Sequence, residues 1–139
     1  MTVYILDTST TSLIQRKHAA TLANVRAHAA DELALSTVTI EEVWNDCFNL
    51  LRRSRTNRDS ALASQFLAES TEMLRPYIYY AQTVSSLDRF DVLVKMKLNV
   101  GKNDLRIAAI ALELNATVVT ANVRDFQRVP NLKWEDWSV

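Results

Sequence analysis

Short apolar runs rich in β-branched and aromatic residues alternate along this chain with longer stretches whose apolar residues recur every three or four positions. The short runs predict buried strands, and the longer stretches predict helices that turn one face toward a core. Strands are expected at residues 2–6, 33–36, 77–80, 117–120 and, as a final edge strand, 132–134. Helices are expected after the polar turn at 8–12 and at about 19–30, 38–51, 58–74, 84–100 and 103–114.

The alternation of strands and helices favours a three-layer α/β/α fold, with a central parallel sheet flanked by helices. We expect the helices at 38–51 and 58–74 to form a hairpin around an arginine-rich turn. Gly101, the only glycine of the chain, is expected to cap the preceding helix in the left-handed conformation, and Asn115 to cap the next one. In such sheets the functional crevice lies beyond the carboxyl ends of the strands.

Composition narrows the class of protein without deciding its function. A chain of 139 residues, with 48% hydrophobic and 23% charged residues, suits one globular domain over residues 1–139. Sixteen basic and sixteen acidic residues cancel, so a nucleic-acid site would need local segregation of charge. One arginine run offers such segregation, although solvated surface charge explains it equally well: Arg52, Arg53, Arg55 and Arg58.

Soft metal ligands are scarce in this chain. Cys47 has no partner and lies in an apolar helical stripe, so we expect it in the core. His18 and His28 are expected at the surface.

The first residues form a strand-like run rather than a targeting segment, and no apolar run approaches membrane-spanning length, so we expect a cytoplasmic protein without a membrane partner.

Five residues with oxygen-bearing side chains are candidates for a common site. Asp7 directly follows the first strand and Asn122 follows the strand at 117–120, which places both in the crevice. Glu42 and Asp104 lie in the first turns of two helices, where the helix dipole favours a carboxylate. Asp125, three residues beyond Asn122, could bind an ion or a water.

Each of these residues also has a purely structural explanation. Thr39 and Glu42 fit a capping box, and Asp104 would complement the dipole of its helix. Asp7 could accept hydrogen bonds from the turn at 8–12, and Asp125 could stabilise a turn of its own. The chemical interpretation therefore depends on the combination of these residues and not on any one of them.

Converging carboxylates in a partly dry cleft repel one another, and a bound cation would relieve that repulsion. Ligands that offer only oxygen select hard ions, so Mg²⁺ is the expected cofactor, with Mn²⁺ as a substitute. We assign Asp7 and Asp104 as its ligands. Such an ion can lower the pKa of a bound water and stabilise the oxygen that leaves phosphorus, which is the chemistry of phosphodiester cleavage.

Four segments, in this order and spacing, resemble the PIN-domain ribonucleases and in particular the toxins of the VapC type. They are residues 7–9 (Asp-Thr-Ser), 36–43 (Ser-Thr-Val-Thr-Ile-Glu-Glu-Val), 103–111 (Asn-Asp-Leu-Arg-Ile-Ala-Ala-Ile-Ala) and 118–126 (Val-Val-Thr-Ala-Asn-Val-Arg-Asp-Phe). The resemblance extends to residues 133–137 and so spans nearly the whole chain.

This resemblance implies a PIN-like fold and a magnesium-dependent endoribonuclease that cleaves RNA. It implies a catalytic centre of Asp7, Glu42 and Asp104, with Asn122 or Asp125 nearby. It also implies the toxin of a type II toxin–antitoxin pair, which inhibits translation, is held by a cognate antitoxin and forms a homodimer.

Two positions qualify the resemblance. Asn122 stands where the wider class frequently has aspartate, which leaves the number of metal ions open. Glu41 is a rival to Glu42, but the apolar stripe and the resemblance both favour Glu42 on the site side.

Other classes of protein fit less well. The main alternative is a PIN-like binding module with little or no catalysis, because Asn122 carries no charge. A receiver-like domain would need a lysine soon after the strand at 117–120, and a dinucleotide-binding domain would need a glycine-rich turn. Three aromatic residues also suggest an apolar surface for a dimer or an antitoxin, although burial in the core is the commoner explanation: Trp44, Phe48 and Phe66.

Overall fold

Five parallel strands form the sheet at the centre of the molecule, in the order β3-β2-β1-β4-β5. The computed structural model describes residues 2–139. Ile5 of the central strand lies opposite Ala34 on one side and Val118 on the other. The predicted parallel sheet with a late edge strand is confirmed. The strands are β1 (Tyr4–Leu6), β2 (Leu33–Ser36), β3 (Ile78–Tyr80), β4 (Thr117–Val119) and β5 (Lys133–Glu135).

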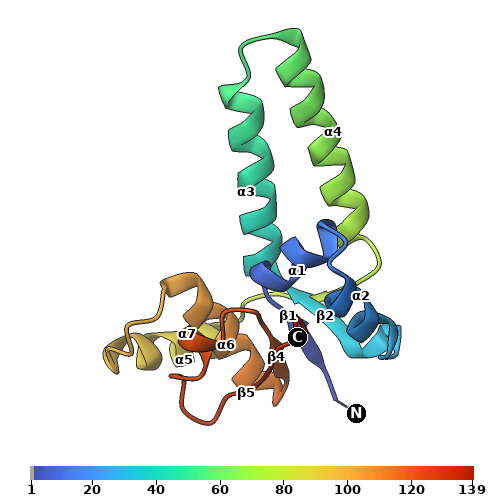
Figure 1. Ribbon diagram of the computed structural model, residues 1–139. Coiled ribbons are helices and arrows are strands. Elements are labelled where there is room, and N and C mark those ends of the chain that lie inside the picture. Colours follow the sequence, from blue (N-terminus) through green and yellow to red (C-terminus); the bar gives the residue numbers. More distant parts are fainter. Residues whose placement is uncertain (1) are drawn as a thin grey trace.

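Helices connect the strands and cover the sheet, as the alternating pattern predicts. Helices α3 and α4 form the expected hairpin, which projects well beyond the sheet (Figure 1). The helical elements are α1 (Thr8–Gln15), α2 (Ala19–Arg26), the short 3-10 helix η1 (Ala30–Glu32), α3 (Thr37–Arg53), α4 (Asn57–Leu74), α5 (Val84–Lys95), α6 (Lys102–Leu114) and α7 (Val123–Phe126). No helix among residues 2–139 has both the length and the apolar composition needed to cross a membrane.

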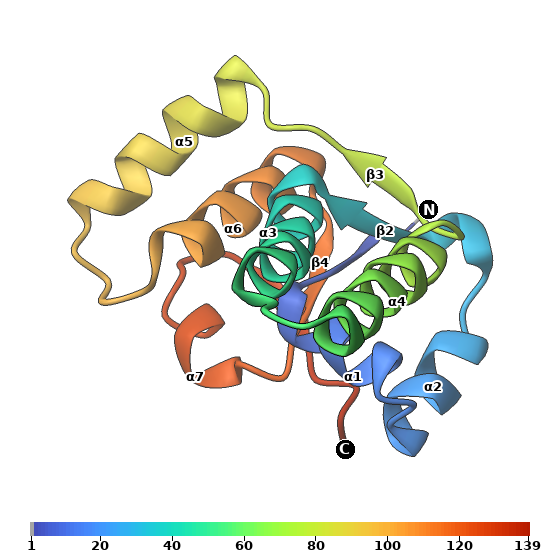
Figure 2. The same cartoon turned by 90° about the horizontal axis from the view of Figure 1, so that it is seen from above.

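The sheet separates two apolar cores because successive strand residues point to opposite faces. Ile5 and Val118 pack on one face with buried residues of α5, α6 and α7. Leu6 and Val119 pack on the other face with residues of α3, α4 and the C-terminal segment. Accordingly, α5 and α6 lie on one side of the sheet, and α1 and α2 on the other (Figure 2). The fold class predicted from the sequence, α/β/α, is confirmed.

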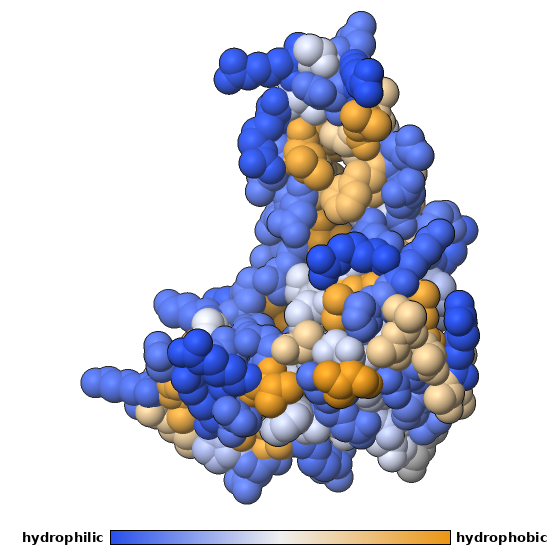
Figure 3. Space-filling view, in the orientation of Figure 1, coloured by the Kyte–Doolittle hydropathy of each residue, from blue (hydrophilic) through white to orange (hydrophobic). Residues whose placement is uncertain are grey.

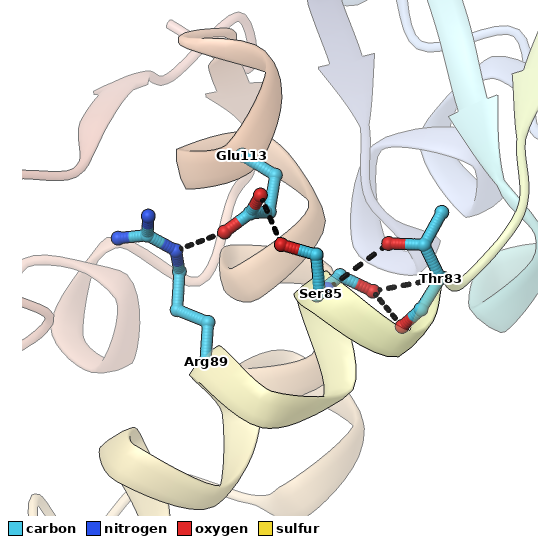
Figure 4. A network of polar contacts seen from close by, with 5 residues as sticks. Thr83, Ser85, Arg89 and Glu113 are labelled. Carbon is cyan, nitrogen blue, oxygen red and sulfur yellow. Dashed lines mark hydrogen bonds and ion pairs between the residues drawn. The ribbon is translucent and has the colours of Figure 1, made fainter.

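Helix α5 is fastened to α6 by a polar network at its exposed side (Figure 4). The Nε atom of Arg89 donates to Oε1 of Glu113 at 2.6 Å, and the hydroxyl of Ser85 donates to Oε2 at 2.7 Å. These two hydrogen bonds hold the pKa of Glu113 below its usual value. Thr83 and Ser86 form a capping box at the start of α5. The network fixes α5 against the helix whose first turn carries predicted site residues.

Two predictions about the segment before α6 are wrong. Helix α5 ends at Lys95 and does not continue to residue 100, because the chain turns through positive φ angles at Lys97 (53°) and Asn99 (60°). Gly101 is not left-handed: it has φ −59° and ψ 149° and is the N-cap of α6. The next helix starts immediately after this residue, so an extended conformation is required there. Asn115 does cap α6 with φ 52°, as predicted.

The start of α3 also differs from the prediction. The helix begins directly after β2, and Ser36 is its N-cap, with Oγ accepting from the Thr39 amide at 3.2 Å. Thr39 is therefore an interior helical residue, and the proposed capping box with Glu42 does not form. The carboxylate of Glu42 is left available for another task.

The burial of three side chains agrees only in part with the prediction from the sequence. Cys47 is fully buried, as predicted. His28 is not a free surface residue, because its ring stacks on Trp137 with centroids 4.4 Å apart and Tyr4 packs against its edge. Leu62, which the helical spacing of apolar residues in 58–74 places on the inward face, is 57% exposed, since the far half of the α3–α4 hairpin extends beyond the sheet.

Candidate active site

Asp7 lies at the point where the central strand ends and α1 begins. Its side chain is 2% exposed and caps α1, with Oδ1 accepting from the Thr10 amide at 2.9 Å and from the Ser9 hydroxyl at 2.7 Å. The structural role that the sequence suggests for Asp7 is therefore real. Capping does not by itself explain why this side chain is buried, because an exposed carboxylate can cap a helix equally well.

Burial raises the pKa of Asp7 above its usual value, and hydrogen bonds from Thr120, Ser9 and Thr10 only partly oppose this effect. A carboxylate whose charge is disfavoured by its surroundings gains more than an exposed one from a nearby cation. The position and environment of Asp7 thus suit a metal ligand.

Serine and threonine hydroxyls join the end of β1 to the end of β4. The hydroxyl of Ser9 accepts a hydrogen bond from the Ala121 amide at 3.0 Å, and Oγ1 of Thr120 accepts one from the Asn122 amide at 2.8 Å. Thr10 donates to the carbonyl of Val119 at 2.9 Å. These contacts hold the turn that carries Asn122 against the turn that carries Asp7.

Glu42 reaches the same region from the first half of α3. The hydroxyl of Thr8, the first residue of α1, donates to Oε1 of Glu42 at 2.6 Å and lies 3.4 Å from the hydroxyl of Thr39. Sequence reasoning gave Thr8 and Ser9 only a place in the turn that donates to Asp7, and it gave no role to Thr120. The only available signal was the segment 7–9, in which Thr8 and Ser9 follow the aspartate directly.

Asn122 connects the two remaining carboxylates. Its Nδ2 atom donates to Oδ2 of Asp125 at 2.9 Å and to Oδ2 of Asp104 at 3.3 Å. The amide therefore lies between two negative charges as a shared donor. An aspartate at this position would add a third charge instead of a hydrogen-bond donor.

The pKa of Asp104 is raised to about 6, first by burial and then by the negative charges of Asp7, Glu42 and Asp125. The hydrogen bond from Asn122 opposes this increase. Hydrogen bonds join Asp104, Asn122 and Asp125, and the negative charges of Asp7 and Glu42 also contribute to the raised pKa of Asp104. The five residues lie after β1, in α3, in the first turn of α6 and at the start of α7. Glu42 is in the second turn of α3 and not, as predicted, in the first, because that helix begins at Thr37.

A cation at this centre would have few protein ligands. Within residues 2–139 no group of three or more His, Cys, Asp or Glu side chains is arranged so that they could hold an ion together. Mg²⁺, however, usually keeps several waters and is bound through only one or two protein carboxylates. Oxygen-only donors, two carboxylates with raised pKa values and an excess of negative charge fit such a partly hydrated ion.

The PIN domain family model matches residues 4–132. Among curated proteins, the chain is 30% identical to Ribonuclease VapC1 of Haemophilus influenzae strain R2866, over 98% of each chain. It is 26% identical to Ribonuclease VapC2 of Rickettsia felis, over 97% of this chain and 98% of that protein.

Solved structures show the same architecture. The structure of VapBC2 from Rickettsia felis bound to a DNA fragment from its promoter has a TM-score of 0.77 and 24% identity, covering 97% of this chain and 98% of the other. VapBC-1 from nontypeable Haemophilus influenzae also has a TM-score of 0.77 and 24% identity, over 99% of each chain. The family model, the full-length relatives and the shared arrangement of sheet and helices agree, and the chain belongs to the PIN domain family.

Proposed function

We propose that this protein is a magnesium-dependent endoribonuclease and the toxin of a type II toxin–antitoxin pair. The observation that carries the proposal is the hydrogen-bonded group of Asp104, Asn122 and Asp125, with the pKa of Asp104 raised by burial and by the charges of Asp7, Glu42 and Asp125. The relatives that match over their full length are named ribonucleases, which supports RNA as the substrate.

Each residue of the centre has a specific task in this proposal. Asp7 and Asp104 would bind Mg²⁺, or Mn²⁺ in its place, while Asn122 holds Asp104 and Asp125 in position. A bound ion of this kind supplies a water of lowered pKa and stabilises negative charge on the phosphate and the leaving oxygen. Glu42, oriented by Thr8 at Oε1, accepts the proton of the attacking water at Oε2.

The proposal extends to protein partners. The solved relatives include VapBC complexes, which supports a cognate antitoxin for this chain, and a homodimer is proposed with it. An apolar hollow of about 590 Å³ opens between the two arms of the α3–α4 hairpin, where apolar side chains gather on the surface (Figure 3). Leu50, Leu62 and Phe66 line it and offer a surface for an antitoxin segment. Sedimentation velocity of the protein, alone and with its antitoxin, tests both assemblies.

The decisive experiment is RNA cleavage by the purified protein. Total RNA is incubated with Mg²⁺, with Mn²⁺ and with EDTA, using the parent and a variant that carries both Asp7→Asn and Asp104→Asn. We expect cleavage by the parent only with metal, and none by the variant. The variant is made and purified in the same way, so it also controls for contaminating nuclease, and its melting temperature shows whether it is folded.

A PIN-like binding module with little catalysis is the second candidate. The uncharged Asn122 and the absence of a three-ligand metal group within residues 2–139 favour it. If the folded parent and the folded variant both leave RNA intact with either metal, the ribonuclease proposal is wrong and the binding module takes its place.

A further inference from the structure

A polar pocket lies between α3, α6 and the loop before α5. It has a volume of about 300 Å³ and is lined by Val38, Glu41, Gln82, Asn103 and Arg106. Glu41 precedes Glu42 in α3, and Asn103 precedes Asp104 in α6, so the pocket and the centre are built on the beginnings of the same two helices. Because consecutive residues of a helix point in directions about 100° apart, the pocket and the acidic centre occupy neighbouring faces of these two helices.

The guanidinium group of Arg106 is held in a fixed orientation in this pocket. Its Cζ atom lies 4.6 Å from the centre of the Phe90 ring, and Nη1 donates to Oδ1 of Asn103 at 2.8 Å. In the part of the chain that the structure describes, Arg106 forms no ion pair with a carboxylate. A positioned cation with unused N–H donors is therefore available to a ligand.

The other lining residues supply a mixture of groups. The amide oxygen of Asn103 is taken by Arg106, so its NH₂ group remains as a donor. Glu41 is exposed and offers only acceptors, while Gln82, in the loop between β3 and α5, offers both kinds of group. Val38 is only 3% exposed, so the surface of the pocket is almost entirely polar.

This mixture favours a nucleobase over a phosphate. A phosphate would meet the carboxylate of Glu41 in the same pocket, and two negative charges there would repel each other. A base is neutral and presents both donors and acceptors on its edges, which match the polar lining of the pocket. The volume is at the lower end of the range for small-molecule pockets, as a single base requires.

We propose that this pocket binds a guanine base of the RNA next to the bond that is cleaved, an inference that rests on the proposed ribonuclease function. Guanine presents two adjacent N–H donors on its Watson–Crick edge, which match the carboxylate of Glu41. It also presents two adjacent acceptors, O6 and N7, which match the guanidinium fork of Arg106. RNA-binding proteins commonly read unstacked bases through these edges.

The first test measures binding without cleavage. The parent protein in EDTA is titrated with guanosine, adenosine and cytidine 5′-monophosphates and with inorganic phosphate, and its backbone amide signals are followed by NMR. We expect the guanosine nucleotide to shift the signals of Gln82, Asn103 and Arg106 at lower concentration than the other ligands. Equal responses to all nucleotides, or to phosphate alone, would overturn the proposal and indicate an anion site.

The second test measures the base preference of cleavage. Short RNAs that differ only in the base next to the cleaved bond are compared for the parent and for the variants Glu41→Gln and Arg106→Lys. Each variant should lower the preference for guanine over adenine, expressed as a ratio of kcat/KM values, by roughly tenfold. The matched control is Arg26→Lys, an exposed arginine on α2, which should keep the parent's preference.

The outcomes separate the two proposals. If the parent cleaves RNA with metal but shows no base preference, or if the variants keep it, the guanine site is wrong and the ribonuclease stands. If the parent cleaves no RNA, the nucleotide titration alone decides whether the pocket selects guanine. Melting temperatures equal to that of the parent establish that the variants are folded.

Discussion

Asp104 is ionised at neutral pH against the negative charges of Asp7, Glu42 and Asp125, which together with burial raise its pKa to about 6. The unfolded chain releases the same proton near the ordinary value of 3.8. Because the pKa is raised in the folded state, Asp104 contributes fully to the free energy of unfolding below pH 3.8. This contribution is lost as the pH rises through about 6. The metal-free protein therefore loses stability at neutral pH through this residue.

Replacing Asp104 by asparagine should remove that loss. In EDTA at pH 7.5 we expect Asp104→Asn to raise the free energy of unfolding by about 1 kcal/mol, a value reduced for solvent screening of the partly exposed side chain. At pH 3.5 no gain is expected, because the parent carboxyl is then protonated. Urea unfolding at both pH values measures the effect. The control is Asp31→Asn, at an exposed position in the short 3-10 helix η1. Equal destabilisation by Asp104→Asn at both pH values would contradict the prediction.

The sequence indicated Asp7 and Asp104 because one follows a strand and the other opens a helix, positions that local patterns reveal, whereas Glu42 lies in the second turn of α3 and was indicated by the resemblance. It did not indicate the contact of Thr8 with Glu42 or that of Ser9 with Ala121, because these partners are far away along the chain. Thr8 and Glu42 are separated by 34 residues, and Ser9 and the Ala121 amide by 112. Serine and threonine also have many local roles in turns and caps, so their types alone do not predict such contacts.

At the scale of elements, the hydrogen bond from Thr8 to Glu42 joins the start of α1 to α3. Thr8→Val removes the hydroxyl at nearly constant volume and should leave Glu42 free to adopt other rotamers. We expect a 10- to 100-fold fall in kcat/KM for RNA, the usual effect of losing a residue that orients a metal-site group. Thr8→Ser, which keeps the hydroxyl, should restore most of the activity. A fall of the same size in Thr8→Ser would show that packing and not the hydrogen bond matters.

The order and type of the elements followed from hydrophobic periodicity, but some of their ends did not. Gly101 looked like the left-handed cap of α5, yet Lys97 and Asn99 adopt the positive φ angles, and Gly101 starts α6. A glycine between two helices can end one or begin the other, and local preference does not distinguish these cases. In the same way Ser36, placed at the end of β2, replaced Thr39 as the cap of α3 because no loop separates strand and helix.

At the scale of the whole molecule, a bound ion should stabilise the fold by mass action. With Mg²⁺ or Mn²⁺ at about 100 times its dissociation constant, the free energy of unfolding should rise by about 2.7 kcal/mol. For a chain of this size the melting temperature would increase by roughly 8 °C. Differential scanning fluorimetry at pH 7.5 measures the shift.

A pair of variants makes this measurement specific to the proposed ligands. Asp7→Asn should abolish the shift, because it removes a buried carboxylate of the centre. Asp31→Asn, a change of equal charge at an exposed position, should keep it. A shift of equal size in Asp7→Asn would place the ion elsewhere.

The sheet order sets the time at which this centre can form during translation. Strand β1 is synthesised first, yet its place is between β2 and β4, and β4 comprises residues Thr117–Val119 near the end of the chain. Synthesis proceeds at about 5–20 residues per second, so Asp7 and Glu42 leave the ribosome seconds before their partners Asp104 and Asn122. A nascent chain thus lacks the assembled centre. For the proposed ribonuclease, the ribosome and the messenger that produce the protein are spared until residues 104–122 have left the ribosome.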